Sequence, residues 1–242
     1  LEESLSENGL CIIAVGTAWN DVYTDLYESI NKADRLMYLS KQEYYKKSQH
    51  VISDKVPLLQ DLTNAILNKE YLVYLQPKIN PKSGHIDSAE VLVRYREKDG
   101  SISLPFKFLP MLESEGLISN IDFFVLEEVC RLLTSWKGTP FSDIRLALNF
   151  SKITLFDSHF FSRFWSVFKR YDLNPEQIEI EITETRENLN KKRMALLLKQ
   201  LKSHGFGIVL DDFGIECSSY EFLMMASIDL LKIDKSIVQK YE

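Results

Sequence analysis

An apolar run that ends in two adjacent acids places the strongest constraint on the fold of this chain. Residues 207–210 read Gly-Ile-Val-Leu and are followed by Asp211, Asp212 and the pair Phe213–Gly214. A short apolar run flanked by glycines predicts a strand of a buried parallel sheet. Carboxylates at the end of such a strand are costly to bury unless they are paired or bound to a cation. We therefore expect a polar site where this strand ends.

Four other segments that read as strands also carry polar residues along or after an apolar run. These residues are Glu90 and Arg94, Asn149, Glu181 and Glu184, and Lys232. Between Ile178 and Thr183, the acids Glu179 and Glu181 alternate with isoleucines, so that the acids share one face of the strand. We expect the isoleucines to pack under helices and Glu181 to point into the mouth of a barrel.

The apolar pattern alternates between two periods along most of the chain. Helices are predicted near 105–115, 120–136, 157–171, 187–204 and 218–226, and strands near 144–150, 178–183, 207–212 and 229–234. This alternation indicates an α/β fold built on a parallel sheet or barrel. In such folds, catalytic and binding residues lie at the carboxyl ends of the strands.

The first two strands of this region are expected to be antiparallel neighbours. The strand Tyr71–Pro77 is separated from the strand that contains Glu90 by the turn Asn80–Gly84. This connection is too short for the crossover between parallel strands, which takes about a dozen residues or more. About six strands follow residue 70, whereas a closed (β/α)8 TIM-type barrel has eight strands in about 250 residues. We therefore expect the last part of the barrel to be missing from this chain or to be supplied by another copy.

The first fifty residues have the pattern of a separate unit. Residues 11–16 predict a strand, and residues 25–47 predict a helix with a polar, basic end. A linker is expected near 47–55, before a second amphipathic helix at 56–69 that opens the next unit. The chain begins at Leu1 without a methionine, and we expect an excised piece whose parent could carry sensor or membrane-tethering segments upstream.

Charge and cysteine content narrow the classes of function. The formal net charge of −6 argues against a broad surface that binds DNA or RNA. Cys11, Cys130 and Cys217 are odd in number and widely spaced, so we expect free thiols in the reducing cytoplasm and no zinc site. No apolar run approaches the roughly 18 residues that would predict a membrane span.

The acids would repel one another if their strands lay side by side. Two carboxylates about 4 Å apart repel by about 4 kcal/mol at an effective dielectric near 20. A single lysine cannot balance the repulsion of several such pairs. Oxygen ligands with one amide favour Mg²⁺ or Mn²⁺ over zinc. Two such ions would hold a phosphodiester oxygen and lower the pKa of a bridging water. A single acid could equally be a solvated strand end, so the whole set of five residues indicates the active site: Glu90, Asn149, Glu181, Asp211 and Lys232.

Two basic residues of the strands have more than one interpretation. Lys232 could orient the attacking water or neutralise charge that develops in the reaction. Arg94 could clamp a phosphate of the substrate, or it could simply pair with a neighbouring acid.

A series of short motifs follows in a fixed order along the chain. The motifs are Tyr74–Pro77, Glu90-Val91-Leu92, Glu115–Ile118, Leu148–Ser151, Glu181–Glu184, Asp211–Gly214 and Leu231–Asp234. With these motifs, residues 56–242 resemble the EAL domain, a cyclic di-GMP phosphodiesterase family whose Glu-Ala-Leu motif stands here as Glu-Val-Leu. The resemblance implies a (β/α)8-type barrel with one antiparallel strand. It also implies metal-dependent hydrolysis of cyclic di-GMP to linear pGpG.

The resemblance implies a role for each residue that matches a family motif. The metal ligands of the family match Glu90, Asn149, Glu181 and Asp211, with Asp212 at the second metal ion. Lys232 matches the lysine near the catalytic water. Glu184 matches a glutamate that holds the loop after its strand, and Gln76 and Arg94 match positions that contact the dinucleotide.

Residues 1–50 carry two further matches, at Ile12–Gly16 and Ala33–Lys41. They are similar to the end of a GGDEF domain, the diguanylate cyclase family. The cyclase signature itself is absent from the chain, and no cyclase activity is expected. The two resemblances together imply cyclic di-GMP as the ligand, a possible homodimer, and upstream GGDEF or sensor domains in the parent chain.

Three features depart from the EAL pattern. Val91 replaces the motif's alanine, a conservative change. The loop after Asp-Asp-Phe-Gly reads Ile215-Glu216-Cys217, where Glu216 replaces a glycine, removes backbone freedom and adds an acid beside the metals. The family's last metal-binding glutamate lies beyond residue 242, so this piece alone is not expected to assemble the complete site. The alternatives to an enzyme are a degenerate cyclic di-GMP-binding or protein-interaction module, and a scaffold that binds no nucleotide.

Overall fold

The computed structural model describes residues 49–183, 188–213, 223–224 and 227–239 of the chain. The chain divides into two compact units, Leu1–Asn64 and Ala65–Glu242. The sheet belongs to the second unit, and so does each predicted site residue.

Strands and helices alternate through the second unit, as the apolar pattern predicts. The elements after α3 (Gln49–Leu67) are β1 (Tyr71–Ile79), β2 (Ile86–Arg96), β3 (Ile102–Ser103), α4 (Pro105–Ser114), α5 (Ile118–Trp136), β4 (Arg145–Asn149), α6 (Lys152–Leu155), α7 (Phe160–Phe168), the 3-10 turn η1 (Pro175–Gln177), β5 (Ile178–Thr183), α8 (Asn188–Ser203), β6 (Gly207–Phe213), β7 (Leu230–Ile233) and α10 (Lys235–Val238). The predicted α/β fold class is confirmed.

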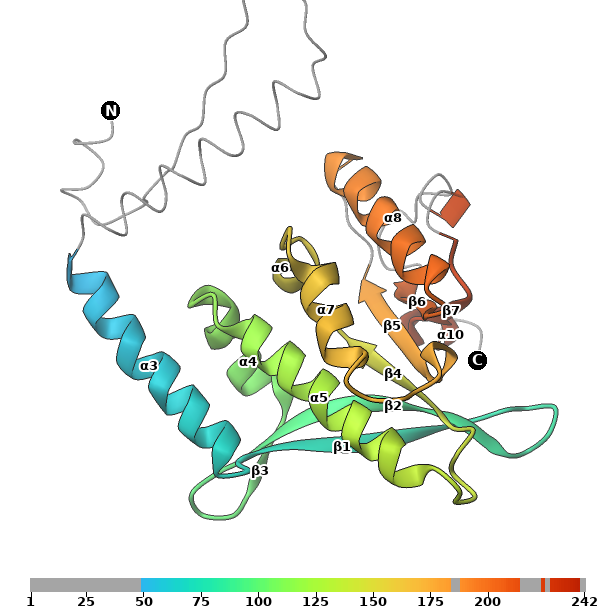
Figure 1. Cartoon of the computed structure of the whole chain (residues 1–242), viewed down its shortest axis with the longest axis horizontal. Coiled ribbons are helices and arrows are strands. Elements are labelled where there is room, and N and C mark those ends of the chain that lie inside the picture. The colour runs from blue at the N-terminus through green and yellow to red at the C-terminus, as the bar shows by residue number, and fades with distance from the viewer. Residues whose placement is uncertain (1–48, 184–187, 214–222, 225–226, 240–242) are drawn as a thin grey trace, which may run out of the picture. The chain divides into compact units, whose positions relative to one another are not determined.

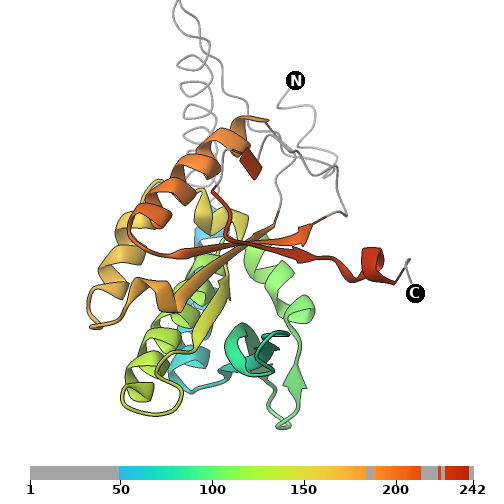
Figure 2. The same ribbon diagram turned by 90° about the vertical axis from the view of Figure 1, so that its right-hand side faces the viewer.

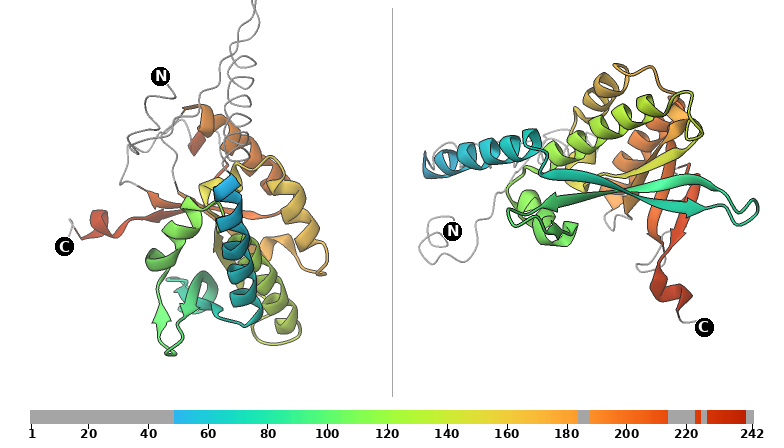
Figure 3. Two further views of the ribbon diagram at one scale, coloured as in Figure 1. Left: turned by 90° about the vertical axis from the view of Figure 1, so that its left-hand side faces the viewer. Right: turned by 90° about the horizontal axis from the view of Figure 1, so that it is seen from below.

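The strands form one sheet in the order β1-β2-β4-β5-β6-β7, and the short β3 pairs with β2. β1 and β2 are antiparallel, which confirms the expected hairpin, and the pairs from β2 through β7 are parallel. The hairpin is a long ribbon whose turn projects beyond the neighbouring strands (Figure 3). Among the described strands, β7 is the edge strand opposite β1, and it leads into α10 (Figure 2). The open arrangement of seven strands is an incomplete form of the predicted eight-stranded barrel.

Helices α5, α7 and α8 lie along one face of the sheet (Figure 1). The residues that face them come from alternate positions of β4, β5 and β6, because successive side chains of a strand point to opposite faces. These buried residues are Leu146, Leu148, Ile178, Ile180, Ile182, Ile208 and Leu210. The opposite face carries Glu179, Glu181 and Asp211 together with the buried apolar residues Ala147 and Val209. The helix layer therefore covers one face of these strands, and the acids lie on the other.

An aromatic cluster stabilises the junction of α7 with the sheet. Phe164 is fully buried, and its ring lies 5.9 Å from the ring of Phe150 and 4.9 Å from that of Phe206. Phe160 and Phe168 join the same cluster. Edge-to-face ring pairs at these separations add to the free energy gained from burial alone.

The structure corrects several boundaries. The helix expected at 56–69 begins at Gln49, so the expected linker at 47–55 is helical from residue 49 onward. The strand β3 was not predicted, because two residues are too few to show a period. The helix expected at 157–171 is shorter, at 160–168. The helix expected at 218–226 and all of residues 1–48 lie wholly or largely outside the described residues, so the proposed domain boundaries stay predictions.

Two further predictions concern cysteine and membrane association. Cys130 is a buried free thiol, and burial raises its pKa to about 12, so this thiol stays protonated at neutral pH. Cys11 and Cys217 lie outside the described residues. In the described parts of the chain, none of the helices combines the length and the apolar character that a membrane crossing requires.

Phe164→Ala is expected to lower the free energy of unfolding by about 3–5 kcal/mol, because it removes a ring that is 0% exposed and leaves a cavity among other rings. The matched control is Phe106→Ala, since Phe106 is 69% exposed and its removal should change the free energy by no more than about 0.5 kcal/mol. Urea unfolding of both variants measures the difference. Similar losses in the two variants would contradict the assignment of Phe164 to the core.

Candidate metal centre

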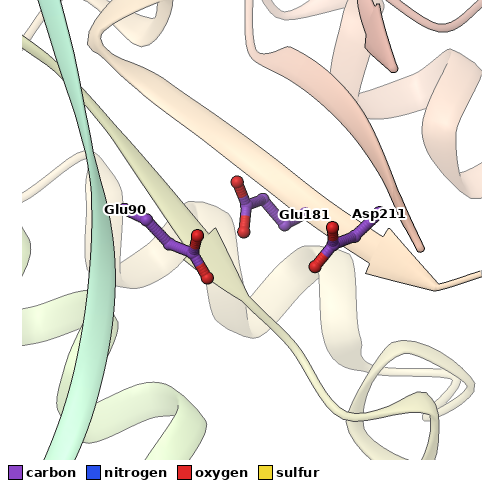
Figure 4. Close-up of side chains that lie close together, drawn as sticks. All are labelled: Glu90, Glu181 and Asp211. Carbon is purple, nitrogen blue, oxygen red and sulfur yellow. The ribbon is translucent and has the colours of Figure 1, made fainter. Parts of the chain in front are cut away.

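Three acids from three strands meet on the face of the sheet that the helices leave open. Glu90 lies on β2, Glu181 on β5 and Asp211 on β6, and each offers a carboxylate oxygen within 4.8 Å of the others. Their carboxylates point toward a common space (Figure 4). Glu181 is fully buried, whereas Glu90 and Asp211 are partly exposed. Asp211 lies near the carboxyl end of β6, as expected, whereas Glu90 lies in the middle of β2 and not at its end.

The strand register explains why these residues meet. Asn149 is the last residue of β4 and pairs with Glu181, while Asp211 pairs with Thr183, two residues further along β5. Parallel strands present their carboxyl ends at the same edge, and alternation then places every second side chain on the same face. Gly207 starts β6 opposite Glu179, where a Cβ atom would lie 3.0 Å from the Cγ atom of Glu179. Glycine at this position leaves room for that buried acid.

Lys232 of β7 contacts all three acids. Its Nζ atom lies 2.8 Å from Oε2 of Glu90, 3.2 Å from Oε2 of Glu181 and 3.3 Å from Oδ2 of Asp211. Asn149 also joins the group, because its Nδ2 atom donates hydrogen bonds to Oε1 of Glu90 at 3.2 Å and to Oε2 of Glu181 at 3.0 Å. The structure thus brings together the five residues that the sequence singles out, and their roles stay predictions.

Burial and charge act against each other in this group. Burial raises the pKa of Glu181 above its ordinary value, and the charges of Lys232 and Lys78 oppose that shift without cancelling it. Burial also disfavours the charged form of Lys232, but its hydrogen bond to Glu90 and the charges of the acids outweigh this effect and raise its pKa. Lys232 is therefore firmly protonated at neutral pH.

The donor set fits a hard divalent cation. Oε1 of Glu181 is buried and has no hydrogen-bond partner in the described structure; Nζ of Lys78 lies 3.8 Å away. A buried carboxylate oxygen without a hydrogen bond is costly, and coordination to a metal ion would satisfy it. Three carboxylates with a neighbouring asparagine amide form an all-oxygen set that suits Mg²⁺ or Mn²⁺. Glu90, Asn149, Glu181 and Asp211 are the residues that would hold it.

The remaining predicted residues lie outside this group. Asp212 has a positive φ of 55°. The residue as a whole is exposed, but partial removal of water from its carboxyl group, together with the charge of Asp211, raises its pKa. Gln76 is exposed and pairs with Glu90 across the hairpin. Arg94 donates a hydrogen bond to the carbonyl oxygen of Val93 and lies over the ring of Tyr74.

No acid in the described ranges lies within ion-pair distance of Arg94, so an ion pair with a neighbouring acid is not seen there. Its guanidinium group therefore keeps donors for a ligand. Glu184 and Glu216 lie outside the described residues.

Sequence reasoning missed a second layer of charges beneath the acids. Lys78 of β1 lies 3.1 Å from Oε2 of Glu179, and Arg145 of β4 lies 3.1 Å from Oε1 of the same carboxylate. Glu179 is thereby paired on both oxygens. The signal available in the sequence was its position two residues before Glu181 on the same face of the strand, but no local pattern identifies Lys78 or Arg145 as its partners.

Asp122 of α5 is a second missed residue. Its carboxylate is buried, and its Oδ2 atom accepts a hydrogen bond from the backbone N–H of Ser151 at 3.1 Å. Ser151 in turn caps α6 with its side chain. Asp122 therefore fixes the segment that follows Asn149, and it is a positioning residue for that amide.

Comparison with known proteins identifies relatives of this chain. The family described as "EAL domain" matches residues 59–242. The bifunctional diguanylate cyclase/cyclic di-GMP phosphodiesterase MucR of Pseudomonas aeruginosa is 28% identical over 221 residues, which cover 88% of this chain and 32% of MucR. The probable cyclic di-GMP phosphodiesterase PdeB of Escherichia coli is 32% identical over 182 residues, which cover 75% of this chain and 35% of PdeB. The chain thus spans about a third of the length of these relatives.

Solved structures show the same fold. The PaMucR phosphodiesterase in its c-di-GMP complex superposes with a TM-score of 0.69 and is 29% identical; the match covers 76% of this chain and 75% of that one. The EAL enzyme Bd1971, in a form bound to cAMP and cyclic di-GMP, gives a TM-score of 0.67 at 24% identity, and the match covers 90% of this chain and 59% of that one. The second likeness supports the fold alone.

The buried position of Asp122 makes a prediction about pH. Burial raises the pKa of its carboxyl group, so the folded state holds a proton that the unfolded state has already lost. Its contribution to stability is therefore fully present below about pH 3.9, the ordinary pKa of Asp, and is lost as pH rises through the higher folded value. The variant Asp122→Asn keeps an oxygen acceptor for Ser151 and has no charge to bury.

The free energy of unfolding of the wild type, minus that of Asp122→Asn, should therefore fall as pH rises from 4 to about 7, through the raised pKa of the buried carboxyl. Urea unfolding of both proteins across this range measures the difference. A difference that grows with pH would show that the folded protein lowers the pKa of Asp122.

Proposed function

The chain belongs to the EAL domain family. We propose that the full-length protein, of which this chain is a part, hydrolyses cyclic di-GMP to linear pGpG with the help of two Mg²⁺ or Mn²⁺ ions. The observation that carries the proposal is the meeting of Glu90, Glu181 and Asp211 around Lys232 on one face of the sheet. The names of MucR and PdeB, which refer to cyclic di-GMP phosphodiesterases, support the substrate.

Each residue would contribute a definite part of the reaction. Divalent cations held by Glu90, Asn149, Glu181 and Asp211, with Asp212 at the second ion, supply Lewis-acid activation of a water and neutralise the phosphodiester. Lys232 stays protonated and donates hydrogen bonds toward the negative charge that develops in the reaction.

Gln76 and Arg94 border this group from the hairpin. Both side chains are at least partly open to solvent, and they would bind the dinucleotide. Glu184 would hold the loop after β5.

The extent of the match to MucR bears on the region of the parent protein that precedes the EAL domain. The match to MucR covers more of the chain than residues 59–242, so it includes residues that we assign to the end of a GGDEF domain. We propose that the parent protein carries a GGDEF or sensor region before residue 50, that it acts in the cytoplasm, and that it forms a homodimer.

Glu181→Gln tests the proposed function in the full-length protein. With Mg²⁺ or Mn²⁺ the wild type should convert cyclic di-GMP to linear pGpG. The rate of the variant should fall by more than about 100-fold, because the loss of a residue that only supports a metal ligand already costs about 10–100-fold. Chromatography of the products over time gives the rate. The control Glu176→Gln makes the same change at an exposed position of η1 and should retain activity. Tight dinucleotide binding without any linear product in the wild type would contradict the enzyme assignment.

Lys232→Ala is expected to reduce turnover by several orders of magnitude while the dissociation constant for cyclic di-GMP changes little. The reason is that Lys232 acts on charge formed in the transition state, and such an interaction affects kcat more than ground-state binding. Steady-state kinetics and calorimetry separate the two quantities. Equal losses in turnover and in binding would assign Lys232 to ground-state binding.

A non-catalytic cyclic di-GMP receptor is the second candidate. Glu216 in the loop after Asp211-Asp212-Phe213-Gly214 motivates it, because the loop gains an acid where the family has a glycine. Glu216→Gly should leave the rate within a few-fold if the natural loop already supports catalysis. A large gain in the rate of pGpG formation would favour the degenerate site.

A further inference from the structure

Hydrogen-bond donors from two side chains occupy the space between the three acids. Lys232 places one Nζ atom within 3.3 Å of a carboxylate oxygen of Glu90, Glu181 and Asp211. These are the same three residues whose oxygens could together hold a metal ion. An ammonium group and a divalent cation would therefore compete for the same three carboxylates.

Asn149 takes part in the same arrangement. Its amide nitrogen, and not its oxygen, faces Glu90 and Glu181, at 3.2 and 3.0 Å. An asparagine carries both donors and an acceptor on one planar group, and a half-turn of the amide exchanges their positions. To serve as a metal ligand between these two acids, Asn149 has to make that half-turn. The N–H groups of Lys232 and Asn149 thus make the contacts to the acids that a bound metal ion would otherwise make.

We propose that Lys232 is an internal counter-ion, which a divalent cation must displace from the acids as it binds, while Asn149 turns its amide oxygen inward. The inference rests on the proposed metal-dependent function. Two positive charges at contact distance among three carboxylates repel each other strongly even at an effective dielectric near 20, so Lys232 and a divalent cation compete for this space. Metal loading then releases Lys232 from the acids and makes its N–H groups available to the substrate.

Lys78 serves as the matched control for a test of whether a divalent cation displaces Lys232. Its Nζ atom also lies near Glu181, 3.8 Å from Oε1, but its hydrogen bond goes to Glu179. Lys78 contacts neither Glu90 nor Asp211 within ion-pair distance in the described structure. Removal of either lysine takes one positive charge from the surroundings of Glu181, whereas only Lys232 lies between all three acids.

The experiment compares Mn²⁺ binding to the full-length wild type, Lys232→Met and Lys78→Met by calorimetry. Methionine keeps an unbranched apolar stem in place of each lysine. Lys232→Met should bind Mn²⁺ at least about tenfold more tightly than the wild type, because the ion no longer has to displace a charge at contact distance. Lys78→Met should gain clearly less. Lys232→Arg keeps the charge and should show no gain.

A second measurement covers the case in which Lys232→Met unfolds without metal. The shift of Tm with Mn²⁺ concentration reports affinity for the folded state, and it should be larger for Lys232→Met than for the wild type. Equal or weaker Mn²⁺ binding by Lys232→Met would overturn the inference, and so would an equal gain in Lys78→Met. If the wild type binds Mn²⁺ and only the gain is missing, the proposed function stands. If none of the proteins binds Mn²⁺, both fail.

Discussion

Mutual repulsion of three carboxylates is the constraint on which this sheet edge depends. Glu90, Glu181 and Asp211 bring oxygens within 4.8 Å of one another, and Glu181 is fully buried. At that distance each pair costs several kcal/mol at an effective dielectric near 20, which is a large part of the stability of an ordinary domain. A positive charge among them therefore offsets a repulsion that would otherwise destabilise the folded state. In the structure Lys232 supplies that charge.

The rest of the second unit separates stability from chemistry. Apolar residues of β4, β5 and β6 pack on one face against α5, α7 and α8, where the rings of Phe160, Phe164 and Phe206 close the core. The opposite face carries the acids of β5 and β6 beside the apolar residues Ala147 and Val209. The register of the antiparallel hairpin sets Gln76 beside Glu90 and Lys78 beside Ser88.

Sequence reasoning succeeds here wherever a period carries the information. The alternation of acids and isoleucines from Ile178 to Thr183 was enough to orient Glu181, and the short connection after Tyr71–Pro77 was enough to predict an antiparallel pair. It fails where a contact joins segments far apart in the chain, as between Asp122 and Ser151. Asp212 shows a third case, because its positive φ breaks the alternation that a strand pattern assumes.

Glu179 and Glu181 show why burial alone does not identify a functional acid. Both are buried, both lie on β5, and both point to the same face. Glu179 has a cation on each oxygen, from Lys78 and from Arg145, so its charge is already neutralised by partners outside the three-acid group. Glu181 lies 3.2 Å from Lys232, which it shares with two other acids, and 3.8 Å from Lys78, and its Oε1 atom has no hydrogen-bond partner in the described structure. Incomplete hydrogen bonding, and not burial, therefore separates Glu181 from Glu179.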